Sequence, residues 1–469
     1  MFASGVREEE ENEITTLTRA LNPIRYPNAG SPIVMTRRAW WLVVLNFLIP
    51  GSVQSLAGSK KLGRFGLSMT FFLWLTMIAI FTTFVMAPTV IFSIATQTIT
   101  LWVTAAVLLF YAVLWMVLTF DTLRLVRLVR TSTSARPKIA LLAIILLFSV
   151  SGTAAYGTFL ATTASGFLSS VFIAGPAQPP IDGRYNILLL GGDAGPDRSG
   201  LRPDSISVVS IDADTGAVTI IGLPRDMENV PFTASSPLAA KYPDGFGAID
   251  GCEVNPCKLN SVYTEVELKT PDLYPDAEKH GSTPGIEGMR DAASGILGIP
   301  IQNVVLIDMQ GFSTLIDALG GVNINVETRV PVGGDENLVG VAEWIEPGKQ
   351  NLNGYYAMWY ARSRHGDDDY ARMARQRQIQ EAILEQANPV NVLTKFQAVA
   401  ESGSNVVRTD IAQSMLGYFV NLAGKSRSQP IARMEITPAN GFDPDNPDFA
   451  DVHARVHELL WPPAPQENG

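Results

Sequence analysis

Hydrophobic positions divide the chain into two parts with different patterns. Residues 65–120 and 139–181 contain no charged side chain, and one helix needs only about 20 apolar residues to cross a bilayer. We predict membrane spans at about 66–86, 98–120 and 139–160. From about residue 182 onward the apolar runs are short and are separated by turn residues, a pattern typical of alternating strands and helices.

A fourth apolar stretch, at residues 39–59, is interrupted by Asn46, Pro50, Gly51 and Gln54. Basic residues favour the cytoplasmic side of a membrane, and two basic clusters, within 60–64 and 124–138, flank the first two predicted spans. If both clusters lie inside, the chain has three spans plus a re-entrant hairpin, with four spans as the alternative. The last span then delivers the rest of the chain to the outside.

The boundaries of the parts follow from composition. We expect a disordered cytoplasmic tail at 1–38, which contains an acidic run and no signal peptide. A membrane region at 39–165, a linker at 166–181, one folded domain at 182–461 and a tail at 462–469 should follow. The chain is 47% hydrophobic, which agrees with a part in lipid, and its net charge of −10 argues against a protein that coats nucleic acid.

The domain after residue 182 reads as one α/β sandwich, in which a central mixed sheet is flanked by helices. The patterns predict the following elements: strands at 185–190, 205–211, 217–223, 304–309 and 322–326, and helices at 284–297, 312–319 and 370–386. A hairpin turn at 212–216 should join the second and third strands.

The two cysteines, Cys252 and Cys257, both fall in the part placed outside. An oxidising compartment favours a local disulfide between them. A metal site that uses both thiolates is the alternative, although no histidine lies in the same loop.

Two aspartates lie near the ends of adjacent predicted strands. Asp193 follows the first strand and Asp204 precedes the second. Because the ends of adjacent strands converge, the two carboxylates could share a hard divalent cation that keeps several waters. Taken alone, loop aspartates are more often turn or cap residues.

Arginines recur after the third strand and around the last predicted helix. Arg225 follows the third strand beside Asp226, and its guanidinium could bind phosphate bidentately, or form an ordinary surface ion pair. Arg362 and Arg364 would point the same way on an extended backbone.

The predicted helix at 370–386 carries a stripe that changes from cationic to apolar along its length. Its members are Arg372, Arg375, Gln376, Ile379 and Ile383. The cationic end coincides with the helix N-terminus, which favours anions. A solvated basic face is the alternative.

Over about 185–389 the chain resembles the LytR-CpsA-Psr family of cell-wall glycopolymer transferases. The resemblance is carried by short motifs in this order: LLLGGD, RPDS, LPRD, KLNSVY, DALGGV, LNG, YARSR and RQRQ. The resemblance implies that Asp193 and Asp204 hold magnesium. It also implies that six residues contact the pyrophosphate of a polyprenyl-linked donor: Arg225, Lys258, Arg362, Arg364, Arg372 and Gln376. The lipid would lie in an apolar groove between sheet and helices, near 304–309 and 312–319.

The expected protein is a magnesium-dependent phosphotransferase of the cell membrane, multi-pass, with its C-terminal domain extracytoplasmic. It would move a glycopolymer phosphate from a polyprenyl-pyrophosphate donor onto peptidoglycan. Arg225, Arg362, Arg364 and Asp369, the last as general base, are the expected catalytic residues. Lys258, Arg372, Arg375 and Gln376 are the expected substrate-binding residues. A lipid pyrophosphate hydrolase and a non-enzymatic membrane lipid sensor are the alternatives.

Three features depart from the family pattern. The segment 229–256 is longer than the family's minimum, RPD replaces the commoner R-S-D, and the membrane segments exceed the usual single span. None of these differences removes a proposed ligand, but the longer segment could reshape the place where an acceptor enters.

Overall fold

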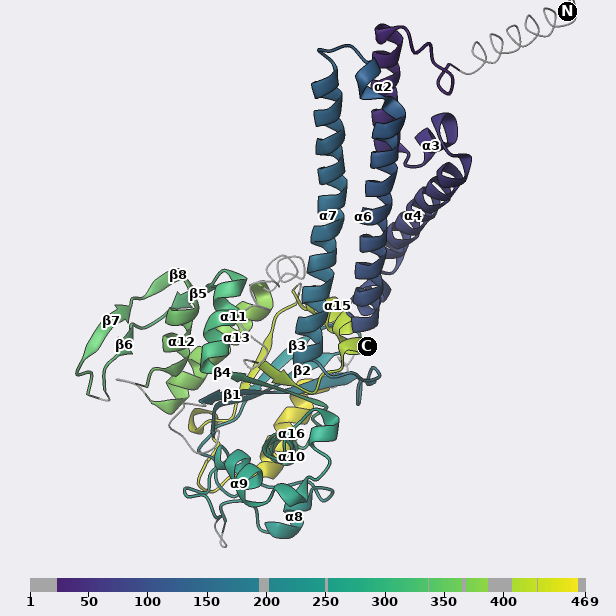
Figure 1. Cartoon of the computed structure of the whole chain (residues 1–469). Coiled ribbons are helices and arrows are strands. Elements are labelled where there is room, and N and C mark those ends of the chain that lie inside the picture. The colour runs from purple at the N-terminus through teal and green to yellow at the C-terminus, as the bar shows by residue number, and fades with distance from the viewer. Residues whose placement is uncertain are drawn as a thin grey trace, which may run out of the picture. The chain divides into compact units, whose positions relative to one another are not determined.

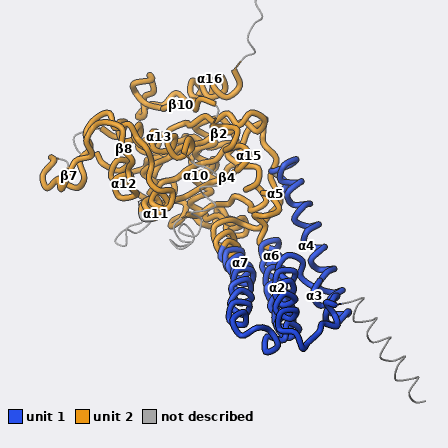
Figure 2. Tube along the Cα trace, turned by 90° about the horizontal axis from the view of Figure 1, so that it is seen from above, with its two compact units in different colours: residues 1–91, 99–163 blue, residues 92–98, 164–469 orange. Residues whose placement is uncertain are grey.

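The structure is a computed structural model of the chain, and it describes residues 23–193, 202–248, 252–335, 337–364, 368–386, 407–427 and 429–462. It divides into two compact units (Figure 2), one made of residues 1–91 and 99–163 and the other of residues 92–98 and 164–469.

Three long apolar helices dominate the first unit (Figure 1): α4 (Lys60–Met86), α6 (Thr98–Val126) and α7 (Arg136–Val171). Each is long and apolar enough to cross a membrane, with mean hydropathy of at least 2.0 over 18 residues. Each of the three predicted spans lies inside one of them. The linker predicted to begin at residue 166 begins later, because α7 continues to Val171.

The interrupted stretch at 39–59 folds as two short helices, α2 (Pro32–Leu48) and α3 (Ser52–Ala57), separated by a turn. α2 begins before the predicted tail boundary at residue 38, since Pro32 takes a first-turn position where proline loses no helical hydrogen bond. At the turn, Gly51 has φ +92°, and a Cβ there would lie 2.4 Å from the backbone of α4. α5 (Pro88–Ala95) follows α4.

A six-stranded mixed sheet forms the centre of the second unit, in the order β10-β3-β2-β1-β4-β9. β1 pairs in antiparallel fashion with β2 and in parallel fashion with β4. The strands are β1 (Arg184–Asp193), β2 (Arg202–Asp212), β3 (Val218–Gly222), β4 (Asn303–Asp308), β9 (Val407–Thr409) and β10 (Ala432–Glu435). The predicted mixed sheet is therefore confirmed. Each end of its first three strands lies one to three residues from the predicted bound.

Alternation along β1 divides the second unit into two layers. Leu188 and Leu190 are buried in the larger core, whereas Leu189 faces the opposite side and packs near Leu384. On the larger-core side the sheet is covered by α8 (Pro237–Lys241), α9 (Ser261–Lys269), α10 (Pro284–Leu297) and α16 (Phe449–Leu460), as Figure 1 shows.

The opposite side carries a second apolar core. It is built from α11 (Met309–Leu319), α12 (Gly354–Arg362), α13 (Asp369–Gln386) and two small sheets. The small sheets pair β5 (Val322–Val326) with β8 (Gly348–Leu352), and β6 (Val330–Gly333) with β7 (Val341–Ile345). α15 (Leu416–Ser426) and short 3₁₀ turns at 128–130, 271–273, 278–280, 413–415 and 438–440 complete the described elements.

The other predicted helices and the turn agree closely with the structure. The helix at 284–297 has the predicted bounds, and that at 370–386 begins one residue early. The helix expected from Phe312 begins at Met309, because the side chain of Asp308 caps it by accepting from the amide of Gly311. In the predicted hairpin turn, Asp212 accepts from two following amides.

Candidate active site

Asp204 occupies an irregularity in the β1–β2 pairing. Its two sequence neighbours pair with the consecutive residues Gly191 and Gly192, so Asp204 is the extra residue of a β-bulge. It was expected just before the strand, but β2 starts at Arg202 because pairing continues past the bulge. Asp193 ends β1, but its side chain lies outside the described residues, so its metal role stays a prediction.

Arg225 follows β3 and reaches the Asp204 carboxylate. The Nη1–Oδ1 distance is 2.5 Å, and the Nε atom lies 3.4 Å from Asp226 and 3.5 Å from Asp369. The Arg225 side chain is only 17% exposed. The prediction that Asp226 orients Arg225 is consistent with this arrangement, although Asp204 makes the closest contact.

Arg362 and Arg364 lie at and after the end of α12. They were expected on an extended backbone, but Arg362 is the last residue of the helix, which Asn353 caps at its start. Arg362 lies 5.8 Å from the ring centroid of Trp359. Arg364 forms ion pairs with Asp204 at 3.3 Å and Asp369 at 3.8 Å.

α13 begins beside these groups. Asp368 caps it through the amide of Ala371, and Arg372 Nη2 donates to the Asp369 carboxylate at 2.9 Å and to the carbonyl of Asp204 at 3.2 Å. Asp369 thus meets three arginines through its two oxygens. This geometry gives Asp369 a part in orienting the arginines, and its role as general base stays a prediction.

Two further predicted substrate ligands, Arg375 and Lys258, contact other parts of the protein. Arg375 donates to the carbonyls of Tyr360, at 3.0 Å, and Ser363, so a role in holding the end of α12 fits it. Lys258 forms an ion pair with Glu228 at 3.7 Å. The backbone next to Lys258 pairs with the segment that carries Arg225.

A pocket of about 280 Å³ opens between the sheet, α11, α12 and α13. Four members of the predicted stripe line it, as helical spacing requires: Arg372, Gln376, Ile379 and Ile383. We call it the central pocket. Its lining residues are Leu189, Leu190, Gly191, Gly192, Asp204, Ser205, Val305, Ile307, Asp308, Met309, Phe312, Leu315, Met358, Ala361, Arg362, Arg372, Gln376, Ile379, Gln380, Ile383 and Val407.

The central pocket has an apolar wall and a charged end. Side chains from β1, β4, α11 and α13 supply the apolar wall, and Asp204, Arg362, Arg372 and Gln376 supply the charged end. The predicted apolar faces of 304–309 and 312–319 are confirmed as part of this wall. Sequence reasoning missed Met358 and Gln380, because neither belongs to a recognisable motif.

The charged end contains buried polar atoms without protein partners. Among the described residues, Arg372 Nε and Gln376 Oε1 have no hydrogen-bond partner, although both side chains are buried. Burial lowers the pKa of Arg372 to about 10; the Asp369 carboxylate opposes that shift, and Arg364 and Arg225 add to it. Leaving buried donors unpaired costs free energy. The charged end is therefore suited to an anionic ligand that supplies the acceptor missing at Arg372 Nε, whereas Gln376 Oε1, itself an acceptor, lacks a donor.

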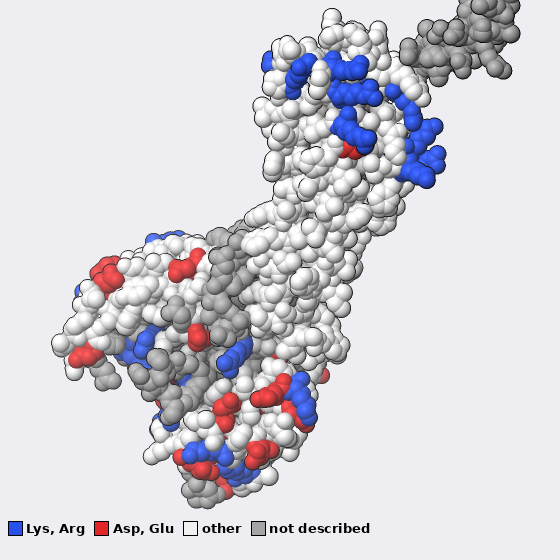
Figure 3. Space-filling model, in the orientation of Figure 1, with Lys and Arg blue, Asp and Glu red and all other residues white. Residues whose placement is uncertain are grey.

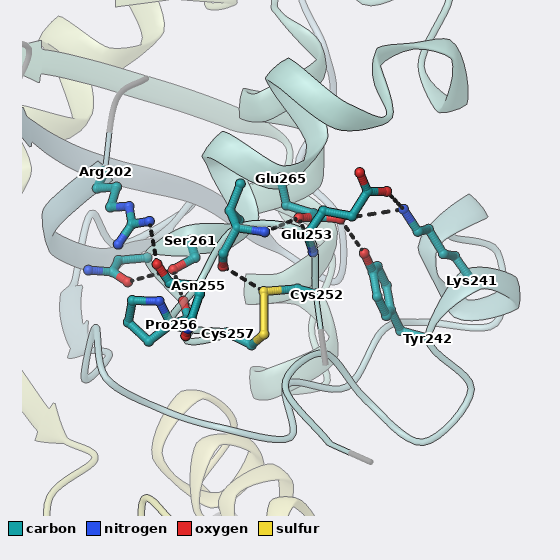
Figure 4. The surroundings of a disulfide bond; sticks show 12 residues. Arg202, Lys241, Tyr242, Cys252, Glu253, Asn255, Pro256, Cys257, Ser261 and Glu265 are labelled. Atoms are coloured by element: carbon teal, nitrogen blue, oxygen red, sulfur yellow. Dashed lines mark hydrogen bonds and ion pairs between the residues drawn. A yellow bond between two sulfur atoms is a disulfide. The ribbon is translucent and has the colours of Figure 1, made fainter. Parts of the chain in front are cut away.

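A loop closed by a disulfide lies beside Arg202 at the start of β2 (Figure 4). Cys252 and Cys257 are bonded, with their Cα atoms 5.5 Å apart, which decides between the two interpretations left open by the sequence. The carbonyl of Asn255 accepts from Arg202 Nη2 at 3.2 Å. The loop thereby contacts the start of β2, next to Asp204.

Comparison with known proteins agrees with this architecture. The family model described as "LytR_cpsA_psr family" matches residues 177–445. The chain belongs to the LytR-CpsA-Psr family. That match covers more than half of the chain and includes each of the described predicted site residues.

Individual relatives are more distant. The chain is 27% identical to the cell wall biosynthesis protein LcpA of Corynebacterium glutamicum over 61% of this chain and 58% of LcpA. It is also 27% identical to TagU, a polyisoprenyl-teichoic acid–peptidoglycan teichoic acid transferase of Halalkalibacterium halodurans, over 56% of this chain and 70% of TagU. The chain thus spans between about half and seven tenths of these relatives. The crystal structure of Bacillus subtilis TagV aligns with 21% identity and a TM-score of 0.42, covering 60% of this chain and 98% of TagV.

Proposed function

We propose that this protein transfers a glycopolymer phosphate from a polyprenyl-pyrophosphate donor to peptidoglycan. The observation that carries the proposal is the central pocket itself, which combines an apolar wall with an end rich in arginine. A ligand that fits both parts has a long apolar chain and an anionic head. The names of TagU and TagV, which describe transfer from a polyisoprenyl-linked polymer to peptidoglycan, support the same ligand class.

The arginines would bind the pyrophosphate and orient it for attack. A peptidoglycan hydroxyl oxygen forms a new bond to the phosphorus next to the first sugar of the polymer. The bridging P–O bond breaks, polyprenyl phosphate leaves, and the hydroxyl proton is lost. Negative charge shifts toward the leaving phosphate as this bond breaks, and guanidinium donors at the charged end would stabilise it.

Magnesium is the proposed metal, with Asp193 and Asp204 as its protein ligands. Carboxylate oxygens suit this hard cation, which usually takes one or two carboxylates and completes its shell with water and phosphate. Asp204 fits, since it lines the central pocket and its side chain is 31% exposed. Among the described residues no group of three or more potential ligands gathers, so the phosphates would have to contribute. When bound, the ion would neutralise part of the phosphate charge.

We propose that the second unit lies outside the cell, anchored by a multi-pass membrane region. Lysines and arginines gather at one end of the helical unit (Figure 3), around the starts of α2 and α4 and the connection from α6 to α7. Such an end belongs on the cytoplasmic side. Protease added to intact protoplasts should therefore remove the domain from residue 182 onward. Protection of that domain, with cleavage confined to the N-terminal residues, would overturn this topology.

The test of activity uses the full-length protein in lipid nanodiscs. It is incubated with a polyprenyl-pyrophosphoryl oligosaccharide, magnesium and soluble peptidoglycan fragments, and attachment of sugar phosphate to the fragment is followed by mass spectrometry. Transfer that depends on the fragment supports the proposal. Release of polymer phosphate to water at the same rate with or without fragment would indicate a hydrolase. Donor binding without either product would indicate a lipid sensor.

A further inference from the structure

Two segments run side by side, and the first starts at the arginine site, by which we mean Arg225, Arg364 and Arg372 around Asp369. One is 225–229, which follows β3, and the other is 444–449, which leads into α16. The amide of Glu228 donates to the carbonyl of Pro444 at 3.2 Å. Arg225 contacts Asp204, which lines the central pocket. The first segment therefore begins at the charged end of that pocket, and the second segment lies beside the first.

These segments end at a second, open cleft of about 510 Å³, which we call the aromatic cleft. Its lining residues are Asn229, Pro231, Phe232, Ala239, Tyr242, Pro243, Asp244, Gly245, Ala248, Pro447 and Phe449. Asn229 lies four positions after Arg225, so the backbone between them spans at most about 14 Å. A short oligosaccharide could occupy the cleft and still reach the arginine site.

One wall of the aromatic cleft is held in place by a buried carboxylate. Tyr242 donates its hydroxyl to Glu265 at 2.7 Å, and Glu265, which is fully buried, also accepts from the amides of Glu253 and Val254 at 3.0 and 3.1 Å. Those amides belong to the disulfide-closed loop (Figure 4). The Tyr242 ring also packs against Phe246, with centroids 5.1 Å apart. The wall is therefore preorganised for binding.

The floor of the cleft is equally constrained. Asn229 has φ +50°, a left-handed conformation that asparagine tolerates better than most residues. Gly245 has φ +97°, and a Cβ at this position would lie 2.7 Å from the Asn229 carbonyl oxygen. Backbone strain of this kind is often found at functional sites. It brings the Asn229 and Asp244 segments together in the cleft.

The chemistry of the lining favours an uncharged, hydroxyl-rich ligand. Of the described residues that line the cleft, none is lysine or arginine, and Asp244 is the one acidic residue, so a polyanionic polymer would find no cation to pair with. Phe232 and Phe449 are half-buried and offer apolar ring surface. Asn229 and Asp244 offer hydrogen-bonding groups. A few polar groups around apolar surface are typical of sites that bind small organic molecules.

We propose that the aromatic cleft binds the glycan of the peptidoglycan acceptor and directs its hydroxyl toward the arginine site. This inference rests on the proposed function, since it assigns the acceptor of the same reaction. It also gives a role to the long segment 229–256, which supplies most of the cleft.

The test compares Phe232→Ala, Phe449→Ala and Asp244→Ala with Tyr418→Ala in full-length protein. Tyr418 is 50% exposed and lies outside the cleft, so it serves as the matched control. At saturating donor, each phenylalanine variant should raise the KM for a peptidoglycan fragment about tenfold, with donor affinity unchanged. Asp244→Ala should raise this KM less. Asp244 is exposed, so its variant keeps the test valid if a phenylalanine variant fails to fold.

Binding of the fragment alone, measured by calorimetry without donor, separates this inference from the proposed function. If the wild type does not transfer but binds the fragment, and the cleft variants lose that binding, the cleft assignment stands and the proposed function fails. Unchanged fragment affinity and KM in the cleft variants would overturn the assignment. Loss of donor affinity in its place would show that the cleft holds the donor polymer.

Discussion

Arg372 and Arg377 both lie on α13, and both side chains are almost fully buried. Their surroundings differ. Arg377 Nε lies 3.1 Å from the Glu435 carboxylate, and its Nη atoms donate to Gln380 and to the carbonyl of Ile206. Arg372 shares the Asp369 carboxylate with two other arginines, and its Nε, like that of Arg377, makes no hydrogen bond among the described residues. Burial alone therefore does not identify a ligand-binding arginine; the difference is that Arg377 lies against the Glu435 carboxylate, whereas three arginines share Asp369.

Removing the Asp204 carboxylate, which lies among the arginines, should have the largest effect on the transfer rate. Asp204→Ala should abolish magnesium-dependent transfer, a loss on the order of a thousandfold or more, because this carboxylate contacts Arg225 and Arg364 and is a proposed metal ligand. Asp193→Ala should behave similarly. The measurement is transfer rate against magnesium concentration, together with circular dichroism.

Asp214→Ala is the control, since Asp214 is an exposed turn residue between β2 and β3. Normal magnesium dependence in both Asp193→Ala and Asp204→Ala would identify them as turn or bulge residues without a metal role.

Arg377→Ala should lower the stability of the fold and leave the transfer rate of the folded protein near normal. Removing the guanidinium leaves Glu435 beside a buried void, and breaking one side of such a pair costs about 3–5 kcal/mol. The midpoint of thermal unfolding of the full-length protein should fall, while turnover per folded molecule at low temperature stays near normal. Replacing both partners by apolar residues, Arg377→Met with Glu435→Leu, should recover most of the stability. An unchanged midpoint in Arg377→Ala would refute the structural role.

Much of the fold was predictable from the sequence, because the local pattern of apolar residues determines where helices and strands form. β1, β2, β3, β4 and the helix 284–297 follow from such patterns, whereas the short edge strands β9 and β10 were not predicted. The β-bulge at Asp204 could not be predicted, since it depends on pairing register between two strands.

The sequence predicted which residues belong to the site better than it predicted where their side chains lie. Arg372 and Gln376 share a helical stripe with the apolar wall, and the structure places both at the central pocket. Arg375, which the sequence put on the same stripe, instead reaches the carbonyls of α12. Which arginine faces a pocket and which faces a neighbouring helix depends on tertiary packing, and no local pattern records it.

Narrowing the central pocket at its apolar wall should have the smallest effect on transfer. The effect should depend on the length of the donor's lipid chain. Ile307 lines the central pocket from β4, so Ile307→Phe would compete with a long polyprenyl chain for space. We expect apparent affinity for a long-chain donor to fall about tenfold, and affinity for a short-chain analogue to change little. The measurement is KM for both donors, and an equal change for both would argue against lipid in this pocket.

The central claim is that the arginines gathered around Asp204 and Asp369 and at the charged end of the central pocket stabilise charge during transfer. Its most direct test is turnover at saturating lipid-linked donor for Arg225→Ala, Arg362→Ala, Arg364→Ala and Arg372→Ala, each in full-length protein and corrected for folded fraction. Each variant should lose about 2–4 kcal/mol of transition-state stabilisation, on the order of a hundredfold in turnover, with Arg372→Ala similar or slightly milder because helix amides remain. Arg225→Lys should rescue only weakly, since a point charge cannot replace a bidentate fork. Near-normal turnover in all four alanine variants would contradict the account and would show that these arginines form a structural ion-pair network.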